Sequence, residues 1–300
     1  MKKTFLSFAL LTLLCGSVSA QVSNVNPRPQ TVKTDGKLFP APKQWKISTS
    51  YALAKSYAVD ALDELGVARA KGGRADYRIT LGVVGEKGMA KYEKLVPNHA
   101  EGYYLSVEPK GAVVVGRDER GLYYGVQTLR EMMAKGQMEI CTVQDWPDVA
   151  YRGAIEGFYG RPWSHEHRLR QLDFYGHNKL NVYIYGPKDD PYHSSPNWRL
   201  PYPEREQKNI KELVDACKRN RVDFVWAIHP GKDIKWNEED YQNLVRKFNL
   251  MYADGVRSFA IFFDDIEGEG TNPDRQVELL NRLTKEFVKA KGDVSPLIIC

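Results

Sequence analysis

The second half of the chain alternates between predicted strands and predicted helices, and this alternation constrains the fold more than any other feature. Short apolar runs bounded by turn residues predict buried strands, and apolar residues at every third or fourth position predict helices. The expected strands cover residues 153–158, 181–185, 224–228, 258–263 and 297–300, and the expected helices cover 164–178, 204–219, 237–255 and 274–291. Strands and helices that alternate in this way build a parallel α/β sheet.

The number of β/α units favours one kind of parallel sheet. Eight such units close a (β/α)8 barrel and typically need about 250 residues. A doubly wound sheet is the alternative, but no Gly-x-Gly-x-x-Gly segment follows any expected strand and no Walker-type loop is present. We therefore expect residues 149–300 to form a TIM barrel truncated after about four β/α units, the N-terminal half of a catalytic barrel. Half a barrel is expected to expose two sheet edges and apolar surface.

Residues 21–148 predict a small α+β domain that precedes the barrel. Residues 21–42 contain four prolines and are expected to form an extended segment ahead of the first folded unit. The expected strands cover residues 45–48, 77–84, 102–107, 112–116 and 140–143, and the expected helices cover 54–65 and 120–135. Glu108-Pro109-Lys110-Gly111 is typical of a hairpin turn, with proline second and glycine fourth. A mixed order of strands with two helices indicates an antiparallel component.

Residues 1–20 have the pattern of a secretory signal peptide. Two lysines precede an apolar run, and a small-residue cleavage site ends at Ala20. The segment is too short to span a membrane, and no other segment is a candidate. Cys15 raises the alternative of a lipoprotein anchor, but the bulky Leu14 before it argues against this. We expect export to the periplasm or beyond the cell.

Charge and cysteine content exclude several classes of function. The net charge is +5, and without Lys2 and Lys3 it falls to +3, which is too mild to indicate a nucleic-acid partner. The odd cysteine count after the leader, Cys141, Cys217 and Cys300, does not indicate a disulfide framework or a cysteine zinc site. His165 and His167 are two positions apart and point to different faces of a helix, so no metal site is expected. No cofactor is expected either, and the oligomeric state is left open.

An acidic pair ends the fourth expected strand and is the strongest candidate for chemistry. Asp264 and Asp265 follow a buried apolar run and open an acidic, glycine-containing loop. Catalytic residues of parallel α/β enzymes lie at the C-terminal ends of strands. The residues alone leave open the alternative of a helix cap or an acidic turn.

The other expected strand ends also carry polar or glycine-rich loops on the same rim. Residues 153–163 place two glycines around two aromatic residues, where a ring can wall a pocket, although these residues alone favour the alternative of a tight turn with core aromatics. A long loop after the second strand carries Lys188, which either reaches the barrel axis or is solvated. His229, at the end of the third strand, either lines the barrel mouth or only turns the chain.

Three motifs in this order resemble glycoside hydrolase family 84. They are the segment from Tyr151-Arg152-Gly153 through Glu156-Gly157-Phe158-Tyr159-Gly160-Arg161-Pro162-Trp163, then Tyr185-Gly186-Pro187-Lys188-Asp189-Asp190, then Phe263-Asp264-Asp265-Ile266. Members are O-GlcNAcases and related β-N-acetylglucosaminidases, also labelled hyaluronoglucosaminidases. The resemblance covers nearly the whole chain after the leader, and residues 21–148 resemble the accessory domain that precedes the barrel here and in family 20 hexosaminidases.

The resemblance implies a retaining exo-β-N-acetylglucosaminidase in which the substrate supplies the nucleophile and forms an oxazoline. Asp264 would then orient the acetamido N–H, and Asp265 would act as general acid and then as base. Gly157, through its backbone, and Lys188 would bind sugar hydroxyls, while Tyr159 would line the acetamido pocket. The expected partner is a carbohydrate with β-linked GlcNAc. Repulsion between two close carboxylates is expected to raise the pKa of one of them.

Other functions remain as alternatives at this point. One is an inactive, truncated fragment that binds GlcNAc without turnover, because sugar contacts from the later strands of a barrel are absent from this sequence. Another is an endo-acting hyaluronidase or a family 20 type hexosaminidase. The latter usually carries an Asp-Glu pair, so Asp264 and Asp265 argue against it.

Overall fold

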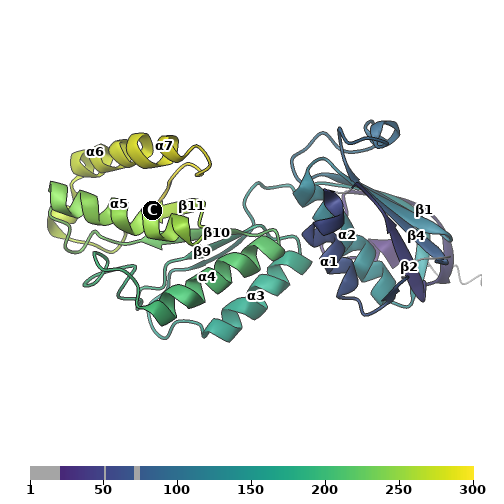
Figure 1. The fold of residues 1–300 in the computed structure, drawn as a ribbon, viewed down its shortest axis with the longest axis horizontal. Coiled ribbons are helices and arrows are strands. Elements are labelled where there is room, and N and C mark those ends of the chain that lie inside the picture. Colours follow the sequence, from purple (N-terminus) through teal and green to yellow (C-terminus); the bar gives the residue numbers. More distant parts are fainter. Residues whose placement is uncertain (1–20, 51, 71–74) are drawn as a thin grey trace, which may run out of the picture.

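The computed structural model describes residues 21–50, 52–70 and 75–300. The proposed leader, residues 1–20, lies outside these described residues. The described chain forms two β-sheets, each with its own helices, that follow one another along the long axis of the molecule (Figure 1). The first sheet is mixed and the second is wholly parallel.

The first sheet has seven strands in the order β1-β7-β5-β6-β4-β2-β3. Its strands are β1 (Thr31–Pro40), β2 (Gln44–Ser48), β3 (Ala68–Arg69), β4 (Tyr77–Val83), β5 (Tyr103–Glu108), β6 (Gly111–Gly116) and β7 (Gln137–Asp145). The hairpin predicted around Pro109 is present as β5 and β6, in which Glu108 pairs with Gly111. Strands β1, β7, β5 and β6 pair antiparallel, whereas β6, β4, β2 and β3 pair parallel.

The expectation that folding begins only after Pro42 is wrong. Strand β1 lies inside the segment that was expected to precede the first folded unit, and it pairs antiparallel with β7 at the edge of the sheet. Its side chains are mostly exposed, so the apolar pattern that reveals a strand is absent. Backbone hydrogen bonds to β7 hold it in place, and the buried Val22 and Val25 anchor the preceding turn.

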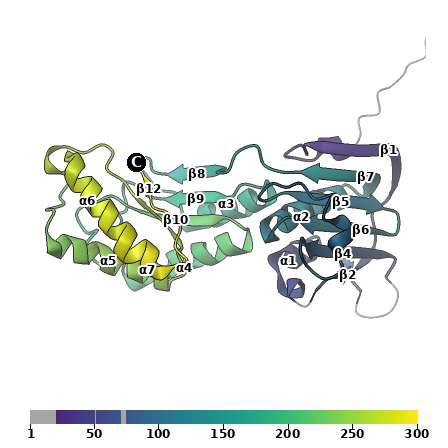
Figure 2. The same cartoon turned by 90° about the horizontal axis from the view of Figure 1, so that it is seen from above.

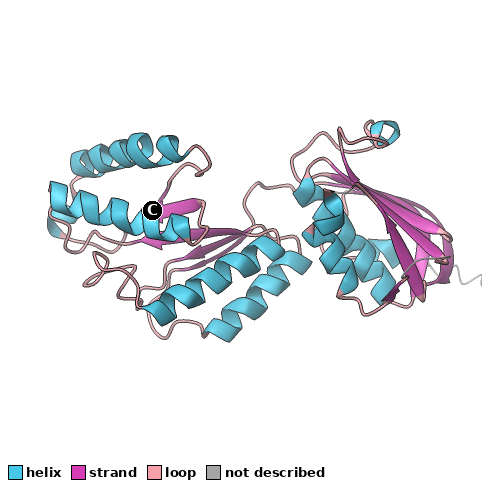
Figure 3. Ribbon diagram, in the orientation of Figure 1, coloured by secondary structure: helices cyan, strands magenta, loops and turns pink. Residues whose placement is uncertain are grey.

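Two helices, α1 (Tyr57–Asp63) and α2 (Glu119–Ala134), pack against this sheet (Figure 3). The apolar face predicted for the second helix is confirmed, because Leu122, Val126, Leu129 and Met133 are all buried. Asp118 caps this helix by accepting a hydrogen bond from the backbone N–H of Gly121 at 2.8 Å.

The second sheet has five parallel strands in sequential order. Its strands are β8 (Gly153–Glu156), β9 (Val182–Tyr185), β10 (Asp223–Ile228), β11 (Ser258–Ile261) and β12 (Ile298–Ile299), and its helices are α3 (His165–His177), α4 (Glu204–Arg219), α5 (Glu238–Ala253), α6 (Pro273–Leu283) and α7 (Lys289–Lys291), the last two joined by a π-helical turn. Strands β8, β9 and β10 lie side by side in Figure 2. The predicted half of a TIM barrel behind a small sheet domain is confirmed.

Side chains of the parallel sheet alternate between two environments, as strand geometry requires. One set packs against the helices and includes Tyr183, Trp226 and Phe259. The other set forms the inner face of the half-barrel, and its buried members are Val182, Ile184, Val225, Ala227, Ala260 and Phe262.

The curl of the sheet buries most of the inner face, so less apolar surface is exposed than a half-barrel predicts. On the two edge strands, Ile155 of β8 is 58% exposed on the inner face, and Ile299 of β12 is 56% exposed on the helix-facing side. Within the described residues, no helix combines the length and apolar character that a membrane crossing needs.

Candidate active site

The ends of four neighbouring parallel strands bring the candidate residues together. Register places Ile155, Ile184, Val225 and Ser258 level with one another on the inner side of the sheet. Every second residue of a strand points to the same face of the sheet. Continued past the strand ends, this alternation assigns the inner face to four further residues, which are Gly157, Lys188, His229 and Asp264. Three of them were singled out from the sequence as site residues.

Asp264 makes the closest charged contact at this rim. The ammonium group of Lys188 donates to Oδ2 of Asp264 at 2.5 Å and lies 3.8 Å from Oδ2 of Asp265. The Lys188 side chain is only 5% exposed, so its ammonium group is shielded from bulk water, whereas Asp264 is 32% exposed. Lys188 therefore reaches the barrel axis, and the alternative of a solvated lysine is wrong.

The electrostatics of Asp264 differ from what repulsion within the acidic pair predicts. Partial burial raises the pKa of its carboxyl group, but the hydrogen bond and charge of Lys188, together with His229, outweigh burial and lower the pKa below its ordinary value. A raised pKa is thus not found at Asp264, because its nearest charged neighbour is a cation. Asp264 stays ionised through the neutral range.

Asp265 lies in different surroundings from its neighbour. Its side chain is 61% exposed, against 32% for Asp264. Its φ of +53° is in the left-handed region, which aspartate and asparagine tolerate better than most residues. This turn carries the carboxylate out of the inner face toward Tyr159, whose hydroxyl donates to Oδ2 at 3.4 Å.

Tyr159 connects the first and fourth strand ends across the mouth of the half-barrel. Its ring is 56% exposed, and the ammonium groups of Lys188 and Lys232 lie 5.5 Å and 5.8 Å from its centroid. Cations at this distance from an aromatic face are attracted by its quadrupole. Tyr159 is therefore held between the acidic pair and two lysines, with its face still accessible.

His229 belongs to this site, although the sequence left its role undecided between lining the mouth and turning the chain. It is buried, and its Nε2 donates to the backbone carbonyl of Asp264 at 2.7 Å. The sequence signal that identifies His229 is the alternation of side chains along a strand. Val225, Ala227 and His229 are two residues apart, so they share one face of β10 and its extension.

Comparison with known proteins identifies the family of this chain. Residues 152–300 match the family described as beta-N-acetylglucosaminidase, and residues 22–146 match the family described as glycosyl hydrolase family 20, domain 2. The solved structure of CpGH84B is 36% identical with a TM-score of 0.81, covering 91% of this chain and 49% of that one. The solved structure of CpGH84D is 30% identical with a TM-score of 0.77, covering 90% and 49%. The chain belongs to glycoside hydrolase family 84.

Curated relatives point to the same family. Protein O-GlcNAcase of Rattus norvegicus is 34% identical over 154 residues, which are 49% of this chain and 17% of the rat protein. The Mus musculus protein of the same name matches equally. This family 84 chain thus spans about half the length of the solved structures and a smaller share of these curated relatives.

A fully buried carboxylate, which sequence reasoning did not single out, anchors the first loop of the candidate site. Glu156 accepts two hydrogen bonds from the Arg168 guanidinium at 2.8 and 2.7 Å, one from the backbone N–H of Trp163 at 3.1 Å, and one from the Tyr183 hydroxyl. An acid on the helix-facing side of a predicted strand, followed by arginine on the next helix, is the sequence signal for this anchor. It fixes both ends of the loop that carries Tyr159.

A second anchor holds the long loop that carries Lys188. One oxygen of Asp190 accepts from the hydroxyls of Tyr185 at 2.7 Å and Tyr202 at 3.0 Å. Its other oxygen accepts from the backbone N–H groups of Tyr192 at 2.8 Å and His193 at 3.3 Å. The loop is therefore tied to the buried sheet immediately beyond Lys188.

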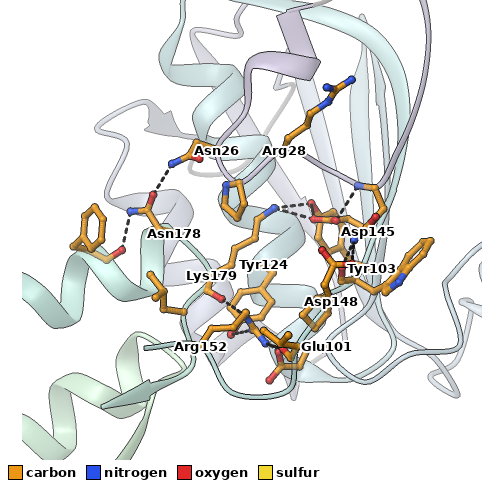
Figure 4. Close-up of a pocket in the computed structure, with 17 residues that line it drawn as sticks. Asn26, Arg28, Glu101, Tyr103, Tyr124, Asp145, Asp148, Arg152, Asn178 and Lys179 are labelled. Carbon is orange, nitrogen blue, oxygen red and sulfur yellow. Dashed lines mark hydrogen bonds and ion pairs between the residues drawn. The ribbon is translucent and has the colours of Figure 1, made fainter. Parts of the chain in front are cut away.

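A cavity of about 510 Å³ lies between the two sheet units, away from the acidic pair (Figure 4). Its buried charged groups are satisfied by one another. Lys179 donates to Asp145 and to the Tyr103 hydroxyl, both at 3.0 Å, and Arg152 donates to Glu101 at 2.5 Å. Because these buried groups already have partners, they serve to connect the two units.

The histidines of helix α3 lie apart from this site. His165 contacts Glu212 at 2.9 Å on the outer surface. Across residues 21–50, 52–70 and 75–300, no three side chains of His, Cys, Asp or Glu gather closely enough to hold a metal ion.

Proposed function

We propose that this chain supplies the acidic half of the active site of a retaining exo-β-N-acetylglucosaminidase that hydrolyses terminal β-linked GlcNAc of the O-GlcNAc type. The observation that carries the proposal is the adjacent pair Asp264 and Asp265 at a barrel rim, where the buried Lys188 donates to Asp264 at 2.5 Å and lies 3.8 Å from Asp265. The family, and the names of its relatives, support the same reaction. No cofactor takes part in it.

The proposed mechanism is substrate-assisted. The carbonyl oxygen of the 2-acetamido group attacks the anomeric carbon as the bond to the leaving oxygen breaks, and Asp265 gives its proton to that oxygen. The product of this step is an oxazoline in its protonated form, an oxazolinium ion that keeps its N–H proton. Asp265 then takes a proton from water as the water adds to the anomeric carbon and opens the oxazoline ring. Asp264 accepts a hydrogen bond from the acetamido N–H, and its lowered pKa keeps it in the accepting form.

The geometry of the pair supports this division of labour. Ordinary glycosidases place two carboxyl groups about 5–5.5 Å or 6.5–9.5 Å apart on opposite sides of the scissile bond. Asp264 and Asp265 follow one strand, so they approach a sugar from the same side. One acid near the acetamide and one at the leaving oxygen suit this placement, with Asp265 exposed toward the aglycone.

The remaining contacts to the sugar come from the first two strand ends. Lys188 has donor capacity beyond its bond to Asp264 and is assigned to a sugar hydroxyl. Gly157 is assigned a backbone contact, because its inward position carries no side chain between the sugar and the strand end. Tyr159 is assigned to the wall of the acetamido pocket.

The test compares Asp264→Asn and Asp265→Asn in the complete gene product that contains residues 1–300, using aryl β-N-acetylglucosaminides with good and poor leaving groups. Asparagine tolerates the left-handed backbone at position 265, so Asp265→Asn removes the acid without straining the turn. Asp265→Asn should spare the good leaving group far more than the poor one, whereas Asp264→Asn should slow both. Equal losses on both substrates for Asp265→Asn would refute the acid/base assignment.

A second candidate is a GlcNAc-binding chain without turnover. The exposed side chains Ile155 and Ile299 on the two edge strands favour it, because open edges leave the sugar with contacts from one side only. We expect the 300-residue chain by itself to be inactive and prone to aggregate. Turnover by purified chain that unfolds cooperatively would exclude this candidate.

We further propose that the chain is organised as a signal peptide over residues 1–20, an accessory α+β domain over residues 21–148 and the catalytic half-barrel over residues 149–300. Export would place the enzyme in the periplasm or outside the cell. N-terminal sequencing of the mature protein tests both the cleavage site after Ala20 and the compartment.

A further inference from the structure

His229 is a buried imidazole that the proposed mechanism does not use. It follows β10 and is 1% exposed. Its Nε2 lies 2.7 Å from the backbone oxygen of Asp264 and 3.5 Å from Oδ1 of the same residue. Both atoms of Asp264 are acceptors, so the hydrogen bond requires the proton of His229 to be on Nε2.

The neighbouring His193 is fixed in the opposite tautomer. Its Nδ1 lies 2.9 Å from the backbone oxygen of Ala227, so its proton is on Nδ1. The two rings are 6.5 Å apart, and neither Nδ1 of His229 nor Nε2 of His193 has a partner among the described residues. Each ring thus donates to one carbonyl and keeps a lone pair on its other nitrogen.

The charged groups that face His229 come from two directions. Lys188, on the loop after β9, opposes a positive imidazolium, whereas Asp264 after β11 favours it. Burial lowers the pKa of His229 and exceeds the opposing effect of the hydrogen bond to Asp264, so the pKa lies below its ordinary value. The single-proton form therefore persists through the neutral range.

Backbone contacts tie His229 to the loop that carries Lys188. The backbone N–H of His229 donates to the oxygen of His193 at 2.8 Å, and Ser194 pairs with His229 as an isolated parallel bridge. Asp264 is consequently held at two points, with its carboxylate bound by Lys188 and its backbone carbonyl by His229. Fixing the carbonyl fixes the Cα from which the carboxylate projects.

We propose that His229, as the Nε2–H tautomer, is a positioning residue that sets the orientation of Asp264 through the main chain. This inference rests on the proposed role of Asp264 at the acetamido group. It adds a residue that does not touch the sugar and acts only by the hydrogen bond to the Asp264 carbonyl.

A matched pair of variants isolates that hydrogen bond in the complete gene product. His229→Gln keeps an amide N–H at a similar reach from the backbone, whereas His229→Leu keeps comparable bulk but has no donor. Both variants lose the ring, so packing losses are shared. We expect kcat on an aryl β-N-acetylglucosaminide to fall about 100-fold in His229→Leu with little change in KM, because misplacement of a reacting group by about 1 Å costs this much. His229→Gln should recover most of the loss. Equal losses in both variants would overturn the proposal.

Nuclear magnetic resonance on the same proteins gives a readout that does not depend on turnover. In the wild type at pH 7, the His229 ring proton should correlate with Nε2, and the backbone carbonyl carbon of Asp264 should shift in His229→Leu but not in His229→Gln. A proton on Nδ1, or an unmoved carbonyl signal in His229→Leu, would overturn the inference. A wild type without hydrolytic activity would count against the proposed function alone, since the tautomer and the carbonyl shift would still be measured.

Discussion

Replacing the buried carboxylate of Glu156 by an amide is the sharpest test of how the first loop of the site is held. The side chain is 0% exposed, and each of its oxygens accepts two hydrogen bonds. In Glu156→Gln one oxygen becomes an NH₂ group and faces two donors. The hydroxyl of Tyr183 can rotate to accept from this group, so the least costly orientation leaves only Nε of Arg168 without an acceptor.

The expected cost follows from that count. A hydrogen bond to a charged group contributes about 1.5–3 kcal/mol, and removing one partner of a buried ion pair costs about 3–5 kcal/mol. Glu156→Gln loses one such bond and leaves the Arg168 charge uncompensated, because that side chain is only 12% exposed. We therefore expect the free energy of unfolding to fall by about 3 kcal/mol, at the lower end of the range for a broken buried pair.

Urea unfolding followed by tryptophan fluorescence measures this loss. Glu212→Gln is the matched control, because Glu212 is 54% exposed in its contact with His165 and should cost less than about 1 kcal/mol. Arg168→Met combined with Glu156→Gln should recover part of the loss. A cost of less than about 1 kcal/mol for Glu156→Gln would refute the reasoning that this carboxylate anchors the loop.

Three further predictions follow from the charged groups around the site. Lys188→Met should move the titration of Asp264, read from its carboxyl carbon signal, to higher pH, because Lys188 lowers the pKa of Asp264 in the folded protein. The lowered pKa stabilises the fold at pH values above the unfolded pKa of Asp264, and this stabilisation is lost as the pH falls through the native pKa. An unmoved titration would contradict this prediction. Burial lowers the pKa of Lys247 to about 8, so the folded protein releases this proton at lower pH than the unfolded chain does. The free energy of unfolding should therefore rise by roughly 2–3 kcal/mol more in the wild type than in Lys247→Met between pH 7 and pH 10. Parallel stability curves of the two proteins would exclude this. Asp190→Asn should lower kcat/KM about tenfold by loosening the Lys188 loop, while Asn at the exposed Asp189 should have little effect; equal effects would remove Asp190 from this role.

Sequence periodicity predicted most of the fold because the elements that build it carry strong local signals. The parallel strands are apolar on both faces, and the helices show apolar stripes and caps such as Asn237, which accepts from the backbone N–H of Asp240 at 2.9 Å. Strand β1 escaped detection because its side chains are mostly exposed and it exists through pairing with a strand about a hundred residues later. Such pairing leaves no trace in local composition.

Some features of the candidate site could likewise be predicted from the sequence, and others depend on tertiary structure. The sequence by itself identified Asp264 and Asp265 as the candidate centre of the chemistry through their place at a strand end, and motif order then implied roles for Gly157, Tyr159 and Lys188. Tertiary structure alone decided which acid accepts a hydrogen bond from Lys188, because this 2.5 Å contact joins residues 76 positions apart in the chain. It also decided that His229 binds the Asp264 carbonyl. Parity along a strand is local and can be counted from sequence, whereas the register between parallel strands, which decides the partner of each inward side chain, is set only when the sheet assembles.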